Sequence, residues 1–177
     1  ALAGRAVFLC GAGVSRRVGL PLFKELTEKI YQRLGETRDN DLAEQRAFGR
    51  DEYDRVLRAL EKRLLKSGDR SRVRAACAAE LTAPKVDLAD HKALLVLSRD
   101  KSGRPRLLTT NFDTIFEHAA RGAVPTVPSH AVKALPKPAG VSDHGILHLH
   151  GRIADEELDL PESDLVLTSA DFGDAYL

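Results

Sequence analysis

The chain has 177 residues, 43% of them hydrophobic and 30% charged, and its formal net charge is +1. That length suffices for one good core, and the near balance of charge predicts no general attraction to nucleic acid or to a membrane. The two cysteines, Cys10 and Cys77, are too few for a disulfide framework or a four-cysteine zinc site, and no apolar run approaches the length of a membrane span. We therefore expect a cytoplasmic protein in a reducing compartment.

The predicted elements follow one another along the chain as strands and helices. A buried strand over 4–10 precedes a glycine turn at 11–13. Apolar spacing then predicts a helix over 22–34, which Gly35 ends as C-cap. Three further helices are expected at 51–66, 70–81 and 88–99, and a turn is expected at 100–105. The last part predicts a strand at 106–109, a helix at 113–121, a short strand with an irregular loop in 122–143, strands at 145–149 and 164–168, and a helix from Ser169.

Strands that alternate with helices indicate an α/β fold with a Rossmann-like open parallel sheet. Residues 36–104 contain helices without an obvious strand, so we expect a helical insertion that covers the ligand crevice of a single domain over 1–177. The chain has no methionine and ends at Leu177 in what reads as the start of a helix. We therefore expect a piece of a longer protein whose C-terminal part is missing.

Three polar clusters each follow an apolar, strand-like run. They are Gly11-Ala12-Gly13-Val14-Ser15, Thr109-Thr110-Asn111-Phe112-Asp113 and His148-Leu149-His150-Gly151. Because the carboxyl ends of parallel strands lie along one edge of the sheet, where the ligand crevice is found, the clusters are expected to converge. This convergence favours a nucleotide enzyme over a generic α/β domain.

The first cluster has the chemistry of a phosphate loop. Glycine at positions 11 and 13 lets the backbone approach a phosphate, although a simple turn explains the same residues. The cluster departs from the dinucleotide fingerprint, since Arg16 stands at the third glycine position and no helix is expected to follow at once. Ser15 is suited either to bond a phosphate or ribose or to form a hydrogen bond within the turn.

The other two clusters carry candidate catalytic groups. The amide of Asn111 is suited to hold a ribose hydroxyl or a water, whereas Asp113 is equally suited to cap the 113–121 helix. His148 and His150 would share a face and suggest a metal pair if the strand ran through both, but no further ligand completes a set. Because the strand is expected to end near Leu149, we favour His150, in the turn, as a catalytic histidine that takes a proton from a ribose hydroxyl.

Together these motifs resemble the sirtuin superfamily. Its pattern of Gly-Ala-Gly-x-Ser, Gly-Ile-Pro, Thr-Gln-Asn-x-Asp and His-Gly is matched in order by residues 11–15, 19–21, 109–113 and 150–151. The departures are Leu22-Phe23-Lys24 in place of Asp-Phe-Arg, Thr110 in place of Gln, and no cysteine beyond residue 77 for the zinc module. These differences, with Val166–Phe172, make the chain similar to bacterial sirtuin-like NADases of antiphage defence.

The resemblance implies cleavage of the nicotinamide–ribose bond of NAD+, with NAD as substrate and no zinc. Asn111 would orient a ribose hydroxyl or the attacking water, and His150 would be the general base. NAD+ would be bound by Gly11, Ala12, Gly13, Ser15, Thr110 and Asp113, with Phe23 covering the nicotinamide or packing inside the first helix.

The resemblance also implies partners and leaves two other functions open. A further domain or a partner protein is expected, a homo-oligomer is compatible, and neither membrane nor nucleic acid is expected as a partner. The first alternative is an NAD-dependent protein deacylase, which shares the base chemistry. The second is a non-catalytic NAD-binding or scaffolding module.

Overall fold

Four short parallel strands form the sheet of the computed structural model, which describes residues 7–38, 41–65, 71–82, 87–132, 134–136 and 144–176. The chain divides into two units: residues 1–20 with 83–164, called here the sheet unit, and residues 21–82 with 165–177, called the helical unit. Each unit is described by itself. Within the described residues, every helix is too short or too polar to cross a lipid bilayer.

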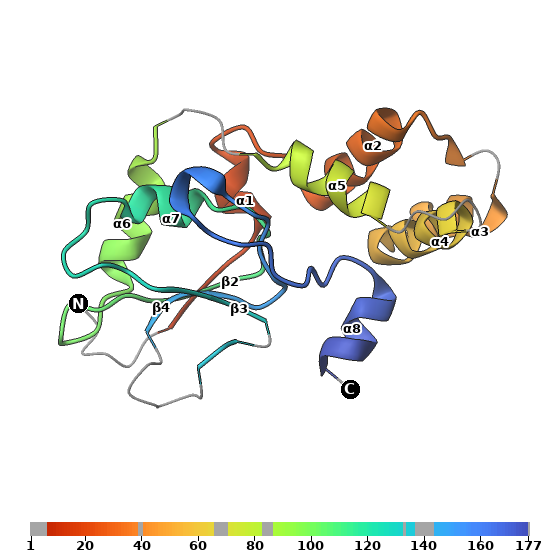
Figure 1. Ribbon diagram of the computed structural model, residues 1–177. Coiled ribbons are helices and arrows are strands. Elements are labelled where there is room, and N and C mark those ends of the chain that lie inside the picture. The colour runs from red at the N-terminus through yellow and green to blue at the C-terminus, as the bar shows by residue number, and fades with distance from the viewer. Residues whose placement is uncertain are drawn as a thin grey trace. The chain divides into compact units, whose positions relative to one another are not determined.

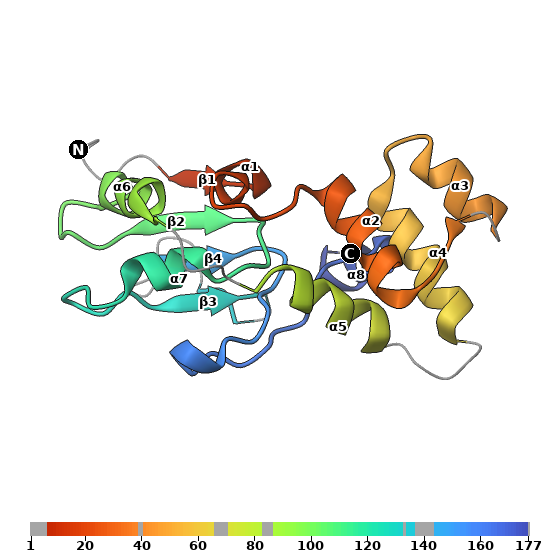
Figure 2. The same ribbon diagram turned by 90° about the horizontal axis from the view of Figure 1, so that it is seen from above.

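The sheet has the order β1-β2-β4-β3 and all its described pairs are parallel (Figure 2). The strands are β1 (Phe8–Cys10), β2 (Arg106–Thr109), β3 (Ser129–Ala131) and β4 (Gly145–His148). Parallel neighbours need crossover connections, and helices supply them between β1 and β2 and between β2 and β3. The expected α/β, Rossmann-like fold class is confirmed.

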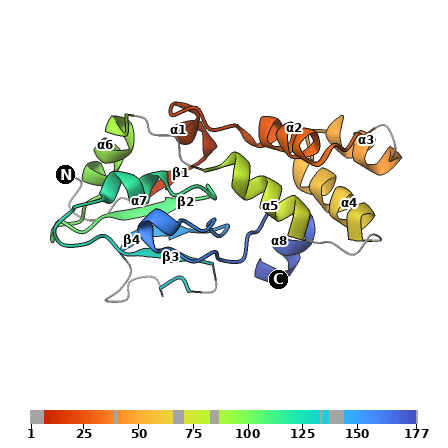
Figure 3. The same ribbon diagram turned by 45° about the horizontal axis from the view of Figure 1, so that its top comes forward.

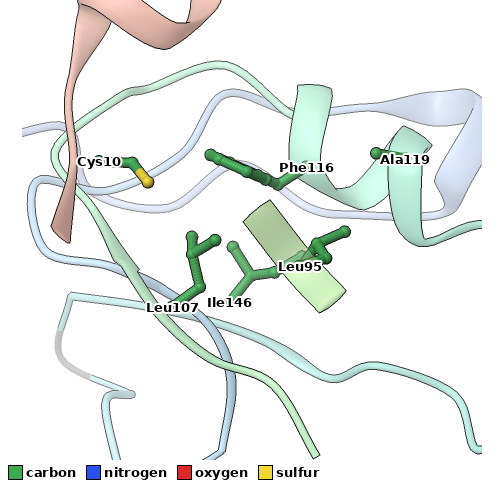
Figure 4. Packing of buried hydrophobic residues seen from close by; sticks show 6 residues of the cluster. All are labelled: Cys10, Leu95, Leu107, Phe116, Ala119 and Ile146. Atoms are coloured by element: carbon green, nitrogen blue, oxygen red, sulfur yellow. The ribbon is translucent and has the colours of Figure 1, made fainter. Parts of the chain in front are cut away.

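Two helices cover one face of this sheet and make its core (Figure 1). They are α6 (Ala89–Leu97) and α7 (Ile115–Ala120). One residue from each of β1, β2 and β4 packs with these helices in a buried cluster of Cys10, Leu95, Leu107, Phe116, Ala119 and Ile146 (Figure 4). Because close-packed cores tolerate little movement, this cluster fixes α7 against β2 and β4.

Two short helices complete the sheet unit. The first, α1 (Ala12–Arg16), begins directly after Gly11. The second, the 3-10 helix η2 (Glu156–Leu158), is capped by Asp155, whose carboxylate also accepts from Thr114 and pairs with His118 at 2.7 Å. These contacts hold the 155–160 segment against α7.

The helical unit contains α2 (Phe23–Leu34), α3 (Leu42–Phe48), α4 (Tyr53–Leu65), α5 (Ser71–Glu80) and α8 (Ser169–Tyr176). The helix α3 packs on α4, α5 packs on α2, and α8 contacts α4 (Figure 3). Apolar residues at helical spacing, such as Val56, Leu57, Leu60 and Leu64, are buried. Gly35 ends α2 in the left-handed region, at φ 66°, as its expected C-cap role requires.

Arg74 of α5 connects three parts of the helical unit. It donates to the Leu165 carbonyl at 2.8 Å and to both carboxylate oxygens of Asp171, and it lies 3.3 Å from Glu61. Asp171 in turn accepts from the backbone N–H of Leu167 and Thr168. The arginine therefore ties α4, α5 and the start of α8 together.

Several sequence predictions need correction. The expected strand at 164–168 does not form: residues 165–168 are buried, but the sheet does not include them, and their backbone groups bond to Arg74 and Asp171. A helix, α1, does follow the glycine turn at once. The sequence reading missed α3, although Asp41 is a regular N-cap that accepts from the N–H of Ala43 and Glu44. The first strand begins at Phe8, Leu9 is 68% exposed rather than buried, and residues 4–6 lie outside the described residues.

The expected insertion over 36–104 differs from the division into units. Residues 21–35 and 165–177 fall in the helical unit, whereas α6 falls in the sheet unit, where Leu95 packs against the strands. Apolar spacing alone predicts that α6 is a helix and does not tell which core it joins. That the helical unit covers a ligand crevice stays a prediction.

Candidate functional site

The three polar clusters lie at one edge of the sheet. The final residues of the strands stand in register, namely Cys10, Thr109, His148 and Ala131. The chain continues across this edge with further backbone bonds, from Thr110 N–H to the Cys10 carbonyl at 3.1 Å and from Leu149 N–H to the Thr109 carbonyl at 2.8 Å. The turns after β1, β2 and β4 are therefore neighbours.

Ser15, Asn111 and Asp113 form a buried hydrogen-bonded chain at this edge. The Asn111 Nδ2 donates to the Ser15 Oγ at 2.9 Å, and the Ser15 hydroxyl bonds to the Asp113 carboxylate. The Asn111 backbone N–H donates to the Thr109 Oγ1 at 3.0 Å. All three members are less than one-tenth exposed, so little water competes for the hydrogen bonds between them.

Asp113 bonds to the start of α7, which is one of the two roles that the sequence left open, and its part in NAD+ binding stays a prediction. Its Oδ1 accepts from the backbone N–H of Ile115 at 3.1 Å, at the start of α7, although the N-cap position itself is Thr114. Burial raises the pKa of Asp113, and the hydrogen bond from Ser15 opposes this rise. The carboxyl group is therefore both a helix cap and the acceptor that orients Ser15.

His150 lies in the turn that follows β4, as expected. The strand ends at His148, and Gly151 has φ 85°, a backbone conformation that glycine adopts without strain. The imidazole of His150 is partly buried, and this burial lowers its pKa. The group is therefore neutral at neutral pH and able to accept a proton.

The remaining candidate residues lie in two places. Gly11 is the N-cap of α1, Ala12 and Gly13 begin that helix, and Thr110 stands beside Gly11, its Oγ1 3.6 Å from an ideal Cβ there. No described atom lies within 4 Å of a Cβ built at Gly13, so its surroundings are open. Phe23 belongs to the helical unit, where its ring packs edge-on against Tyr53 at 6.0 Å between centroids. Its place beside a nicotinamide stays a prediction.

Residues 105–177 match the family model of the SIR2-like domain. This part of the chain is similar to the SIR2-like domain. The matched segment includes Asn111, Asp113 and His150, and it begins after the Gly11–Ser15 cluster. The resemblance inferred from the motifs is thus confirmed at the level of the superfamily for residues 105–177.

A curated relative extends the similarity to nearly the whole chain. The uncharacterized protein y4cA of Sinorhizobium fredii (strain NBRC 101917 / NGR234) is 47% identical over 181 residues, which cover 99% of this chain. The chain spans only 15% of that relative's length.

The sirtuin-like edge also contains a second buried network, which the sequence reading missed. His148 is fully buried, with Nδ1 2.9 Å from the Asn111 carbonyl oxygen and Nε2 2.7 Å from the Glu117 Oε1. Ser129 donates to the same Glu117 oxygen, and Arg152 donates to the Ser129 Oγ at 2.6 Å. In the sequence, Glu117 is one charged residue inside a predicted helix, and Arg152 is one charged residue beside a glycine. Neither pattern indicates a functional residue.

At this edge, the described residues include no set of side chains placed to bind a metal ion. Among the described residues, no group of three or more histidine, cysteine, aspartate or glutamate side chains is placed to hold a metal ion. His148 and His150 do not act as a pair, since the ring of His148 is occupied by Asn111 and Glu117.

Proposed function

We propose that this chain carries the reaction site of an NAD+ glycohydrolase, which cleaves the bond between nicotinamide and ribose. The observation that carries the proposal is the Ser15–Asn111–Asp113 chain, buried at the strand edge next to the turn of His150 in a sirtuin-like protein. SIR2-like proteins use NAD, and an edge with a fixed amide and a neutral imidazole suits the cleavage of a glycosidic bond.

The hydrogen-bonded chain fixes which way the Asn111 amide is turned. The Ser15 hydroxyl bonds to the Asp113 carboxyl group, and its oxygen accepts from the Asn111 Nδ2 at 2.9 Å. The amide therefore presents its NH₂ group to Ser15 and keeps its Oδ1 for another donor. That oxygen accepts a hydrogen bond from the attacking water or from a ribose hydroxyl, and so orients it.

His150 supplies the base. Water attacks the anomeric carbon, the carbon–nitrogen bond breaks, nicotinamide leaves with the bonding electrons, and the water's proton passes to the neutral imidazole of His150. The products are ADP-ribose and nicotinamide. The transition state is expected to be oxocarbenium-like, as in other glycoside hydrolyses.

Substrate binding is assigned to the residues around this centre. The backbone of Gly11, Ala12 and Gly13 approaches the pyrophosphate, and the open space at Gly13 supports this role. Thr110 lies beside Gly11 and contacts the same part of the substrate.

The biological setting of the proposal is antiphage defence in the cytoplasm. The similarity to a relative of which the chain spans 15% supports a further domain, in the same polypeptide or in a partner, that controls NAD+ cleavage. A homo-oligomer is compatible with this arrangement.

The test is NAD+ consumption with product identification by the full-length protein and three variants. Asn111→Ala and His150→Ala are expected to reduce turnover by about 10²- to 10⁴-fold, the usual contribution of acid–base catalysis. The matched control is His144→Ala, because His144 precedes the amino end of the same strand that His150 follows, and it should retain the parental rate.

The outcome also decides between functions. Parental turnover in both Asn111→Ala and His150→Ala would contradict the site. NAD+ use that requires an acetyl-lysine peptide would identify a deacylase, and NAD+ binding without turnover would identify a binding module.

A further inference from the structure

His148 lies two residues before the proposed base and is fully buried. It therefore touches no substrate and is not itself a catalytic residue. Its two ring nitrogens nevertheless reach the site, since one bonds the backbone of Asn111 and the other bonds Glu117. The protonation state of this ring follows from what those two partners are able to do.

Both partners of His148 are acceptors. A backbone carbonyl has no proton to give, so Nδ1 must carry one. Burial by itself would raise the pKa of Glu117, but the hydrogen bonds from His148 and Ser129 and the nearby charge of His148 outweigh it, and the pKa lies below its ordinary value. The Glu117 oxygen that faces Nε2 also accepts from Ser129, whose own oxygen accepts from Arg152, so this oxygen is an acceptor and Nε2 must carry a proton as well.

The surrounding charges agree with an imidazolium at this place. Glu117 faces it from α7, and Asp113 lies close enough to interact with it electrostatically. Arg152 reaches Glu117 only through Ser129, whose hydroxyl accepts from the guanidinium and donates to the carboxylate. Ser129 thus shields the imidazolium from direct contact with a second cation.

We propose that His148 is a positioning residue, a buried imidazolium paired with Glu117 that holds the Asn111 backbone so that its side chain is correctly placed for NAD+ cleavage. Asn111 is fixed at three points: its N–H by Thr109, its carbonyl by His148 and its amide by Ser15. The inference rests on the proposed function for its kinetic consequence and on hydrogen-bond chemistry alone for the charge of the ring.

The charge is tested without turnover, by ¹⁵N NMR of the full chain labelled at histidine, with the His148 signals assigned by their loss in His148→Gln. Both ring nitrogens are expected to be protonated at pH 7.5. In Glu117→Gln, which keeps the size and an acceptor oxygen, one nitrogen should lose its proton while the bond to Asn111 persists. A neutral His148 ring in the parent protein overturns the proposal.

The positioning role is tested by separating kcat from KM. His148→Gln is expected to lower kcat by about 10- to 100-fold, the loss that a small misplacement causes, with KM for NAD+ within about threefold. Glu117→Gln should fall between His148→Gln and the parent, because it keeps the contact to Asn111. If His148→Gln does not fold, Glu117→Gln with a reduced kcat and an unchanged KM carries the same conclusion.

A matched control separates positioning from stability. His91 is also fully buried in the sheet unit and packs edge-on against Phe116 of α7, but its contacts do not include Asn111. His91→Gln should lower the denaturation midpoint and leave kcat unchanged, whereas an equal loss of kcat in His91→Gln and His148→Gln overturns the proposal. A parent protein without NAD+ turnover refutes the proposed function instead, and the NMR result still decides the charge.

Discussion

Replacing Ser15 with alanine removes one oxygen atom that two buried groups share. The Asn111 Nδ2 loses the acceptor at 2.9 Å, and the Asp113 carboxylate loses its hydroxyl donor while keeping the Ile115 N–H. Leaving a buried polar group without its partner costs about 1–3 kcal/mol. Two such groups, one of them partly compensated by Ile115, predict that Ser15→Ala lowers the free energy of unfolding of the sheet unit by about 2–4 kcal/mol.

The assay must report on the sheet unit alone. The three tyrosines, Tyr31, Tyr53 and Tyr176, all lie in the helical unit and the chain has no tryptophan, so intrinsic fluorescence follows only that unit. Native-state hydrogen exchange of peptides spanning β2 and β4 gives the opening free energy of the sheet unit, and the tyrosine signal, expected to change little, is the internal control.

A double-mutant cycle refines this prediction. The bond between Ser15 and Asn111 is broken by either single substitution, so Ser15→Ala and Asn111→Ala together should cost about 1–2 kcal/mol less than the sum of the two. A loss below about 0.5 kcal/mol in Ser15→Ala, or additivity within the usual error of about 0.3–0.5 kcal/mol, would refute the reasoning. NAD+ turnover should fall with Ser15→Ala, because the amide of Asn111 is then free to rotate.

Three further predictions concern other parts of the molecule. Burial lowers the pKa of His91, so the unfolded chain binds more protons than the folded chain below about pH 6.5, and stability falls as pH falls through that range. In urea titrations, His91→Leu should therefore lose less stability than the parent protein between pH 7.5 and pH 5.5. Equal losses would contradict this prediction. Burial also lowers the pKa of His150, so the acidic limb of the pH profile of kcat/KM for NAD+ should have its midpoint below about pH 6.5. A midpoint above pH 7 would contradict the role of His150 as the base. Arg74→Met removes the guanidinium that lies 3.3 Å from the nearly fully buried carboxylate of Glu61 and that also binds Asp171, so the helical unit should lose about 3 kcal/mol by tyrosine fluorescence. A loss below about 1 kcal/mol would show that these contacts are not coupled.

The sequence predicted the features of the edge that local chemistry determines. Glycine and threonine after short apolar runs indicated where β1 and β2 end, and the expected turn after β4 placed His150 outside the strand alternation. The convergence of the clusters followed from parallel topology alone. The direct contact between Ser15 and Asn111 could not follow from it, because topology brings turns together without specifying side-chain bonds.

Two of the errors have one physical origin, which is that a buried segment or side chain does not reveal its hydrogen-bond partners. Residues 165–168 are as buried as a central strand, and Leu165, Val166 and Leu167 are typical strand residues. Their backbone groups are instead satisfied by the Arg74 guanidinium and the Asp171 carboxylate, from elements that sequence spacing does not connect to them. The same holds for His148, whose acceptor Glu117 lies 31 residues earlier in the chain.

Two serines do the same work in the two buried networks of the sheet unit, and this similarity explains how the edge is ordered. Ser15 accepts from an amide and donates to Asp113, while Ser129 accepts from a guanidinium and donates to Glu117. In each case one hydroxyl links a nitrogen donor on one side to a carboxyl group on the other. The two networks meet at Asn111, whose side chain belongs to the first and whose carbonyl belongs to the second. Substitutions at Ser15 and His148 should therefore both act through this one residue, and their effects on kcat should combine to less than the product of the two alone.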